Sequence, residues 1–322
     1  MRVLGLRGGV RVQLRYLLDR EGLLGPLMLL PAIIYILALV GFPLVLAIAY
    51  SLSDVTAGDT SLDNFVGLDN FSRIIKRPEF RRALQNTILF VVVSQVLIIV
   101  LATTLAQILS QDFRGKAVVR FLIILPWAAP IALGTIAWLW LLDSEFSPID
   151  LILRELHLLG PAGLLGRDAI LGTDTNLVWL GRERLTMASV IMVHVWRLLP
   201  LSTVILLAAL TTIPRDVLDQ AEVDGAGFWR TLFQIKIPLI LPIMGIAILF
   251  GMILTAGDMA VVFNLTRGGP VFYTQVLPTW SFFIGIEGGS LAQGAAVALF
   301  LLPLLLVVTI LVLRLARRSE VT

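Results

Sequence analysis

The segment LDQAEVDGAGFWRTLFQIKIPLILP, Leu218–Pro242, places a charged stretch between two long apolar stretches. Its charged residues are Asp219, Glu222, Asp224, Arg230 and Lys236. Apolar or small residues at positions 217, 218, 221 and 225 recur at helical spacing and give this stretch one uncharged face. Gly225 and Gly227 predict a turn, after which a second apolar face leads to Pro238. We therefore expect two short helices, joined by a glycine turn, lying along a membrane surface.

The composition around this segment is that of a membrane protein. The chain has 322 residues, of which 58% are hydrophobic and 15% charged, and its mean hydropathy is +0.93. Soluble domains have fewer apolar and more charged residues. The absence of cysteine and the presence of only two histidines argue against a thiolate or histidine metal site.

Long apolar stretches predict six membrane spans, because a helix needs about 20 apolar residues to cross the hydrocarbon core. We expect an all-α, polytopic integral membrane protein with a single domain over residues 1–322. The predicted spans are Leu24–Leu52, Ala83–Leu109, Val118–Leu142, Leu185–Leu210, Ile237–Phe263 and Leu291–Leu313.

The distribution of Lys and Arg predicts that both termini are cytoplasmic. Basic residues cluster in the tail 1–22, near Arg114, in the loop 211–236 and after Leu313. The sequence pI is 9.6, and the basic residues behind this value lie at the ends of the spans, where membrane topology and anionic lipid headgroups explain them. We therefore expect a lipid bilayer and no nucleic acid as partner. The loop 211–236 is then cytoplasmic.

Two interpretations of this loop remain open on pattern alone. One is an amphipathic connector that rests on lipid headgroups. The other is a helix that enters a groove of a partner protein, which fits the acids between Asp216 and Asp224 better, because anionic lipid favours basic helix faces.

The loop resembles the EAA motif of ABC importer permeases, in which Glu-Ala-Ala is followed by Asp-Gly-Ala and then Ile-x-Leu-Pro. Asp219 stands at the position of the Glu, and Gln220 and Ala221 at the Ala pair. The Asp-Gly-Ala triplet is matched directly and Leu is changed to Ile in the last part, as the residues Asp224, Gly225, Ala226, Ile235, Ile237 and Pro238 show.

Other stretches resemble the carbohydrate-uptake group of these permeases, the MalF/UgpA-like subunits. FVGLDNFSRII at residues 65–75, with ALQNT at 83–87, resembles the segment before the second span of that group. VVFNLTRGGP at residues 261–270 resembles its loop after the fifth span. The resemblance implies a type I ABC importer fold, similar to MetI, in a bacterial or archaeal inner membrane.

The same resemblance implies the function and the partners. This chain would form half of a sugar path together with a second, MalG-like permease. Two ATPase subunits and an extracytoplasmic solute-binding protein would complete the complex. The chain is expected to be non-catalytic and to bind no cofactor, since ATP and Mg²⁺ belong to the ATPases and no Gly-x-x-x-x-Gly-Lys-Ser/Thr motif occurs here.

In this family the EAA helix docks in a cleft of the ATPase and transmits its closure to the spans. We assign the residues of this coupling joint as Asp219, Gln220, Ala221, Glu222, Asp224, Gly225, Ala226, Phe228 and Trp229. Gly225 would permit the turn. Phe228 and Trp229 would be anchors, and an interfacial aromatic belt explains Trp229 equally well.

For the substrate path the candidates are Asp258, Asn264, Arg197, Trp138 and Gln95. Charges inside a membrane are costly and usually functional. Asp258 would accept sugar hydroxyls, or it would instead pair with Arg197 or cap a helix break at Gly257. Gln95 is explained as well by polar contacts between helices.

Two other functions are weighed against a sugar importer. The same architecture would serve a non-sugar solute such as glycerol phosphate or a polyamine. An intramembrane enzyme would need a catalytic set within the spans, and Asp258 has no second acid beside it there.

Overall fold

The computed structural model describes residues 21–161, 170–172 and 174–319, and in this part the regular structure is helical, with two isolated β-bridges. The tail predicted over residues 1–22 lies mostly outside the described residues. The helices of the first half are α2 (Glu21–Ile36), η1 (Leu37–Gly41), α3 (Phe42–Ser51), α4 (Asp69–Ile75), α5 (Pro78–Ser110), α6 (Lys116–Ala128), α7 (Ile131–Leu141) and α8 (Pro148–Glu155). Those of the second half are α9 (Glu183–Thr211), α10 (Arg215–Val223), α11 (Phe228–Arg230), η3 (Thr231–Lys236), α12 (Ile237–Ala256), α13 (Ala260–Thr266), α14 (Leu277–Phe282), η4 (Phe283–Glu287), α15 (Leu291–Leu299) and α16 (Leu301–Ser319).

Five helical stretches of the described chain are long and apolar enough to cross a membrane, and a bent pair adds a sixth. The continuous stretches are Gly25–Ser51, Pro78–Ser110, Glu183–Thr211, Phe228–Ala256 and Leu291–Arg314. The predicted all-α polytopic fold with up to six spans is confirmed.

The third predicted span, Val118–Leu142, differs from the prediction, because it is not one helix. α6 and α7 meet at an angle of 100°. Ala129 leaves the helical region, with φ −71° and ψ 139°, since a residue that precedes proline is pushed toward extended conformations. Pro130 also lacks the N–H that would continue the helix.

The fifth predicted span also has different ends. The second short helix expected before Pro238 is not separate: a continuous helical stretch runs from Phe228 to Ala256 through the π-helical turn η3. It stops before Gly257, and α13 begins three residues later at Ala260. The apolar run that predicted a span to Phe263 therefore contains a break at residues 257–259.

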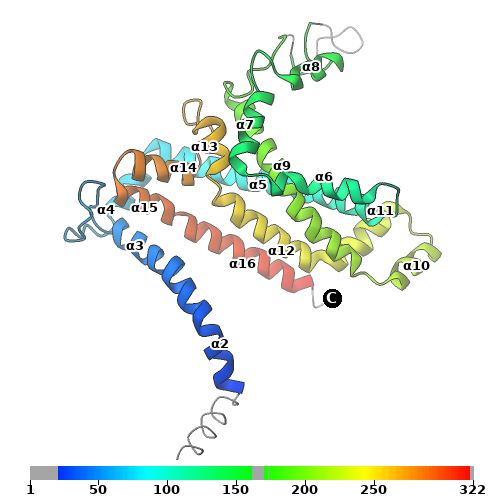
Figure 1. The fold of residues 1–322 in the computed structure, drawn as a ribbon, viewed down its shortest axis with the longest axis horizontal. Helices are drawn as coiled ribbons and strands as arrows, with labels where there is room; N and C mark the ends of the chain where they lie inside the picture. The colour runs from blue at the N-terminus through cyan, green and yellow to red at the C-terminus, as the bar shows by residue number, and fades with distance from the viewer. Residues whose placement is uncertain (1–20, 162–169, 173, 320–322) are drawn as a thin grey trace, which may run out of the picture.

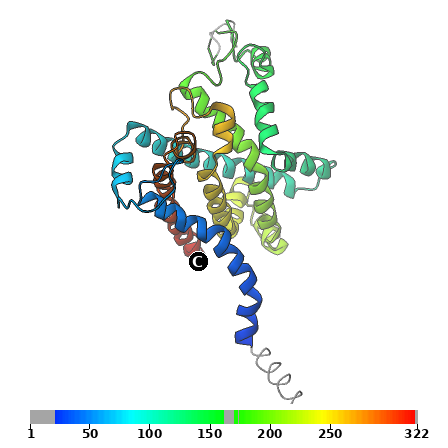
Figure 2. The ribbon, with the colours of Figure 1, turned by 60° about the vertical axis from the view of Figure 1, so that its left-hand side comes forward.

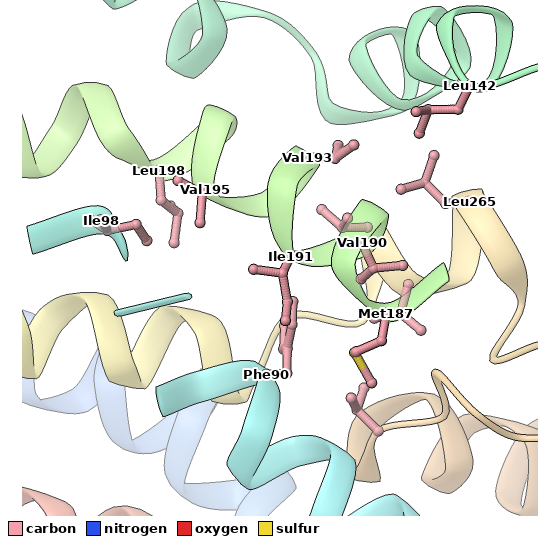
Figure 3. Packing of buried hydrophobic residues seen from close by; sticks show 13 residues of the cluster. Phe90, Ile98, Leu142, Met187, Val190, Ile191, Val193, Val195, Leu198 and Leu265 are labelled. Carbon is pink, nitrogen blue, oxygen red and sulfur yellow. The ribbon is translucent and has the colours of Figure 1, made fainter. Parts of the chain in front are cut away.

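The core of the bundle lies where α5, α9 and α12 pack side by side (Figure 1). α9 is the most buried of the spans. Its apolar residues meet α5, α7 and α13 in one cluster, of which Phe90, Val190, Ile191 and Leu265 are members (Figure 3). Some hydroxyl groups on α9 donate to a carbonyl one turn earlier in the helix, as Thr203 Oγ1 does to Leu199 O at 2.7 Å.

The first span projects away from this bundle in both ribbon views (Figures 1 and 2). Its last part, α3, contacts α15, while α2 leads away and its apolar side chains from Leu27 to Ile36 are exposed. So much apolar surface is stable only in lipid or against another subunit.

The connection between α7 and α9 forms an extension that stands apart from the bundle and carries α8 (Figure 1). Asp150 of α8 is buried within this extension. The carboxylate accepts hydrogen bonds from Leu177 N and Trp179 Nε1, each at 2.9 Å. These hydrogen bonds tie α8 to the segment that precedes α9 and satisfy the buried carboxylate.

Candidate functional site

α10 follows α9 directly and turns its apolar side to the bundle. Ala221 is buried, and Val217 and Leu218 pack against the cluster formed by α5, α9 and α12. Asp219, Gln220, Glu222 and Asp224 are exposed. The predicted amphipathic helix is therefore present, with its acids on the surface.

No carboxylate of α10 forms a salt bridge with any residue that the structure describes. The four acids at positions 216, 219, 222 and 224 outnumber the one cation of this helix, Arg215, so its exposed surface is net negative. Such a surface repels anionic headgroups and attracts a basic partner.

A glycine turn ends α10 as the sequence predicts. Gly225 has φ +72°, a conformation that glycine adopts without steric cost. Gly225 N donates to Glu222 O at 3.0 Å and Ala226 N donates to Ala221 O at 2.9 Å. This pair of hydrogen bonds is the Schellman motif of helix ends, and it fixes the angle between α10 and the next helix.

Three aromatic residues after the turn form an exposed group, which we call the aromatic cap: Phe228, Trp229 and Phe233. Phe228 and Trp229 meet edge to face, and Trp229 stacks on Phe233 with ring centroids 5.9 Å apart. All are more than half exposed. The cap therefore lies at the surface beside α10 and does not anchor this segment in the core.

A second polar cluster lies at the break between α12 and α13. Asp258 Oδ2 is 2.7 Å from Arg197 Nη1, and Asp258 Oδ1 accepts a hydrogen bond from Ala260 N at 2.8 Å. His194 Nδ1 is 3.1 Å from the carboxylate, close enough for an ion pair but not aligned for a hydrogen bond. His194 Nε2 is 2.9 Å from Thr255 Oγ1.

Both structural roles weighed for Asp258 are therefore realised together: it pairs with Arg197 and it caps the helix after the break. The side chain is almost buried, whereas that of Arg197 is 29% exposed. A contact of Asp258 with substrate stays a prediction.

The other predicted path residues do not join this cluster. Asn264 Nδ2 donates to Thr135 Oγ1 at 3.1 Å between α13 and α7. Trp138 packs edge to face on Trp196. Gln95 is buried against Gly251, and its amide has no hydrogen-bond partner among the described residues.

One residue at this site was not singled out from the sequence. Trp127 lines a cavity of about 350 Å³ together with Arg197, Asp258 and Met259. The cavity therefore combines an aromatic face with the charged groups of the Arg197–Asp258 pair. The sequence offers one indication of this residue, because Trp127 lies between Pro126 and Pro130, which predict a bend in the third span.

A helical membrane bundle with an exposed acidic helix and a polar break within a span is the architecture expected of a subunit that moves a solute across the membrane. The chain belongs to the family of binding-protein-dependent transport system inner membrane components, whose model matches residues 98–321. It is thus a multi-pass inner-membrane permease of an ABC importer and a non-catalytic subunit.

Curated relatives cover nearly the whole chain. A probable ABC transporter permease protein of Brucella suis is 29% identical over 91% of this chain and 96% of its own length. The diacetylchitobiose uptake system permease protein DasB of Streptomyces coelicolor is 27% identical, over 98% and 93%. The trehalose/maltose transport system permease protein MalF of Thermococcus litoralis is 28% identical, over 92% and 95%. These relatives confirm the resemblance to the carbohydrate-uptake group.

Among solved structures, a chain of a bacterial ABC transporter that imports the acidic polysaccharide alginate has the same fold. The TM-score is 0.75 at 20% identity, covering 95% of this chain and 99% of that chain. The expected ABC importer permease fold is therefore confirmed.

Proposed function

We propose that this permease imports a di- or oligosaccharide, or a sugar derivative, and forms half of its path through the membrane. The support is that relatives of similar length are named for diacetylchitobiose and for trehalose and maltose. The cavity at the α12–α13 break is consistent with this substrate class, because Trp127 and the Arg197–Asp258 pair offer an apolar face beside hydrogen-bonding groups. A non-sugar solute in the same architecture remains the second candidate.

The partners in this proposal are a second, MalG-like permease, two ATPase subunits and an extracytoplasmic solute-binding protein. ATP and Mg²⁺ are bound by the ATPases. The termini and the segment 211–236 lie in the cytoplasm, in line with the distribution of Lys and Arg.

α10 is the element that couples the permease to its ATPase. The observation that carries this assignment is the exposed acidic face of α10, which no described residue neutralises, on a helix whose other face is packed on the bundle. A helix held in this way transmits a displacement of its partner to α9 and α12. The Schellman turn at Gly225 links α10 to the long helix that follows.

Charge reversal at Asp219 or Asp224 tests the coupling assignment. We expect Asp219→Lys and Asp224→Lys to reduce ATP-driven uptake about tenfold or more, because like charges at a docking interface cost several kcal/mol. The amount of chain in the membrane should stay unchanged. Uptake of labelled solute and ATP hydrolysis are measured together in vesicles that contain the complete complex.

Asp63→Lys is the matched control, since Asp63 is an exposed acid in the loop before α4. It should leave both uptake and ATP hydrolysis unchanged. Normal uptake in both α10 variants would contradict the assignment of α10 as the element that couples the permease to its ATPase.

A further inference from the structure

Arg197 and Asp258 line the cavity of about 350 Å³, at which three elements of the bundle converge. Trp127 comes from α6, Arg197 from α9 and Asp258 from the break after α12. The volume is within the range of small-molecule sites. A larger cavity of about 540 Å³, which Gln107 faces between α5 and the helix after α10, has no charged residue among those that line it. Of these two cavities, only the smaller offers charged groups to a ligand.

The carboxylate of Asp258 is occupied by groups of this chain. Oδ1 accepts a hydrogen bond from Ala260 N at 2.8 Å, and Oδ2 accepts one from Arg197 Nη1 at 2.7 Å. His194 Nδ1 also lies 3.1 Å from Oδ2, and the side chain of Asp258 is only 6% exposed. Little acceptor capacity is therefore left for the hydroxyl groups of a ligand in the cavity.

The guanidinium group of Arg197 is in the opposite situation. It carries five N–H groups and no acceptor, and Nη1 donates to Asp258. Nε and Nη2 have no hydrogen-bond partner in the part of the chain that the structure describes, while 29% of the side chain is exposed. Unused donors on a charged group inside a membrane protein are unfavourable. They indicate acceptor atoms that come from outside the chain.

We propose that Arg197 contacts the transported solute at this cavity, and that Asp258 is a positioning residue that acts through Arg197. This inference rests on the proposed import of a sugar. Hydroxyl and ring oxygens of a sugar accept hydrogen bonds from Nε and Nη2, and Trp127 offers an aromatic face to the C–H side of the ring. Asp258 orients the guanidinium group and balances its charge. The sugar is thus held by donors of Arg197, and not by the carboxylate that the sequence suggested.

A direct contact between Asp258 and the solute would have to replace a hydrogen bond that the carboxylate already makes. Loss of the bond from Arg197 would leave a nearly buried carboxylate without its opposite charge, which is strongly unfavourable. Loss of the bond from Ala260 N would remove the cap at the start of α13. Arg197, in contrast, can bind a solute through Nε and Nη2 and keep its bond to Asp258.

Direct binding of a sugar to the complete complex, held in lipid nanodiscs without the solute-binding protein, tests the role of Arg197. The probes are the 4-nitrophenyl glycosides of maltose and of diacetylchitobiose, whose nitrophenyl group quenches tryptophan fluorescence. We expect Arg197→Met to weaken binding about ten- to a hundredfold, the range for lost hydrogen bonds from a charged donor. Arg197→Lys keeps the charge and part of the donors, and should recover some of this loss.

The effect of Asp258 depends on Arg197 if Asp258 acts through it. In the otherwise unchanged chain, Asp258→Asn should weaken binding about fivefold or more, because the guanidinium group is no longer held in place. In the Arg197→Met chain the same substitution should change the affinity less than about twofold. The double variant removes both charges together, so it keeps the measurement possible where a single variant does not fold.

The control is a second ion pair that does not line the cavity. Arg182 and Asp174 lie 2.8 Å apart in the extension between α7 and α9, with both side chains more than half exposed. Arg182→Met and Asp174→Asn should bind both glycosides like the wild type.

Two outcomes would overturn the inference and leave the import of a sugar standing: wild-type affinity in Arg197→Met, or an equal loss from Asp258→Asn in both backgrounds. Absence of quenching by both glycosides in the wild-type complex would contradict the proposed import of a sugar itself, and this inference with it.

Discussion

Asp258 illustrates how a carboxylate is kept inside a membrane bundle. Arg197 supplies the opposite charge at 2.7 Å, and the backbone N–H of Ala260 supplies a second hydrogen bond. Removing one member of a buried pair leaves an uncompensated charge, whereas removing both often changes stability little. The pair therefore holds the break between α12 and α13 against α9.

We expect Asp258→Asn and Arg197→Met each to lower the free energy of unfolding by about 1.5–3 kcal/mol, the usual range for hydrogen bonds to charged groups. The double variant should lose clearly less than the two single losses added together, because its partners are removed together. Unfolding of the chain in detergent, followed by tryptophan fluorescence, measures the three values.

The pair Arg182–Asp174 is the control, because both side chains are more than half exposed at a distance of 2.8 Å. Its double-variant cycle should give a coupling of about 1 kcal/mol or less. Strictly additive losses at Arg197 and Asp258 would mean that the two residues do not stabilise each other.

Among single residues, the sequence predicts those features that depend on the residue itself and its neighbours in the chain. Gly225 was correctly expected at a turn, because only glycine takes a positive φ without steric cost. The Lys236–Gln107 hydrogen bond joins residues that are far apart in the chain. No spacing rule within one helix predicts such a contact.

Among the elements, two glycines on neighbouring helices, Gly294 on α15 and Gly285 on η4, approach each other closely. A Cβ on Gly294 of α15 would lie 2.9 Å from Ser281 O and 2.9 Å from Gly285 N. These are backbone atoms, which cannot rotate away. Small residues at such contacts let membrane helices pack closely, so Gly294 sets the distance between α15 and the α14–η4 helix.

We expect Gly294→Ala to lower the free energy of unfolding by roughly 1–3 kcal/mol, the usual cost of overpacking. Thermal unfolding of the purified chain in detergent measures the change. Gly58→Ala is the matched control, since an added Cβ there meets nothing within 4 Å. A melting temperature for Gly294→Ala equal to that of Gly58→Ala would contradict the close packing.

The third span shows that hydropathy does not predict where an apolar stretch is broken into two helices. Val118–Leu142 is apolar throughout, so its composition predicts a single helix. Pro126 remains inside α6, while Pro130 coincides with the bend of 100°. Proline is tolerated in membrane helices where neighbours satisfy the freed backbone groups. Both prolines lack the N–H that a helix needs, so the local rule for proline does not tell which of the two breaks the helix.

At the scale of the whole molecule, the polar parts lie apart from one another. The extension with α8 stands away from the bundle, and α10 lies at another end (Figure 1). The first span leaves the bundle on its own (Figure 2). A chain with separate exposed surfaces of this kind is suited to meeting different partners at different places.

The proposed assembly gives a prediction at this scale. Purification of the tagged chain from its native membranes should bring down an ATPase, a second permease and a solute-binding protein. Asp219→Lys should lose the ATPase and retain the second permease, because it changes the surface of α10 alone. Mass spectrometry of the purified complexes measures the ratio of subunits. Equal loss of both partners would mean that the variant affects folding.

The sequence by itself determined the class of this protein. Several apolar runs of about 20 residues indicate helices that cross a membrane. The segment 218–242 combines an acidic helix with a glycine turn, and both are properties of the local sequence. Only the tertiary structure decided that Arg197 and Asp258 neutralise each other, that Gln107 faces a cavity and that the third span bends. The first two features depend on contacts between segments that are far apart in the chain, and the third on which of two nearby prolines interrupts the helix. The order of residues along the chain gives neither the distance between two segments nor the choice between two prolines.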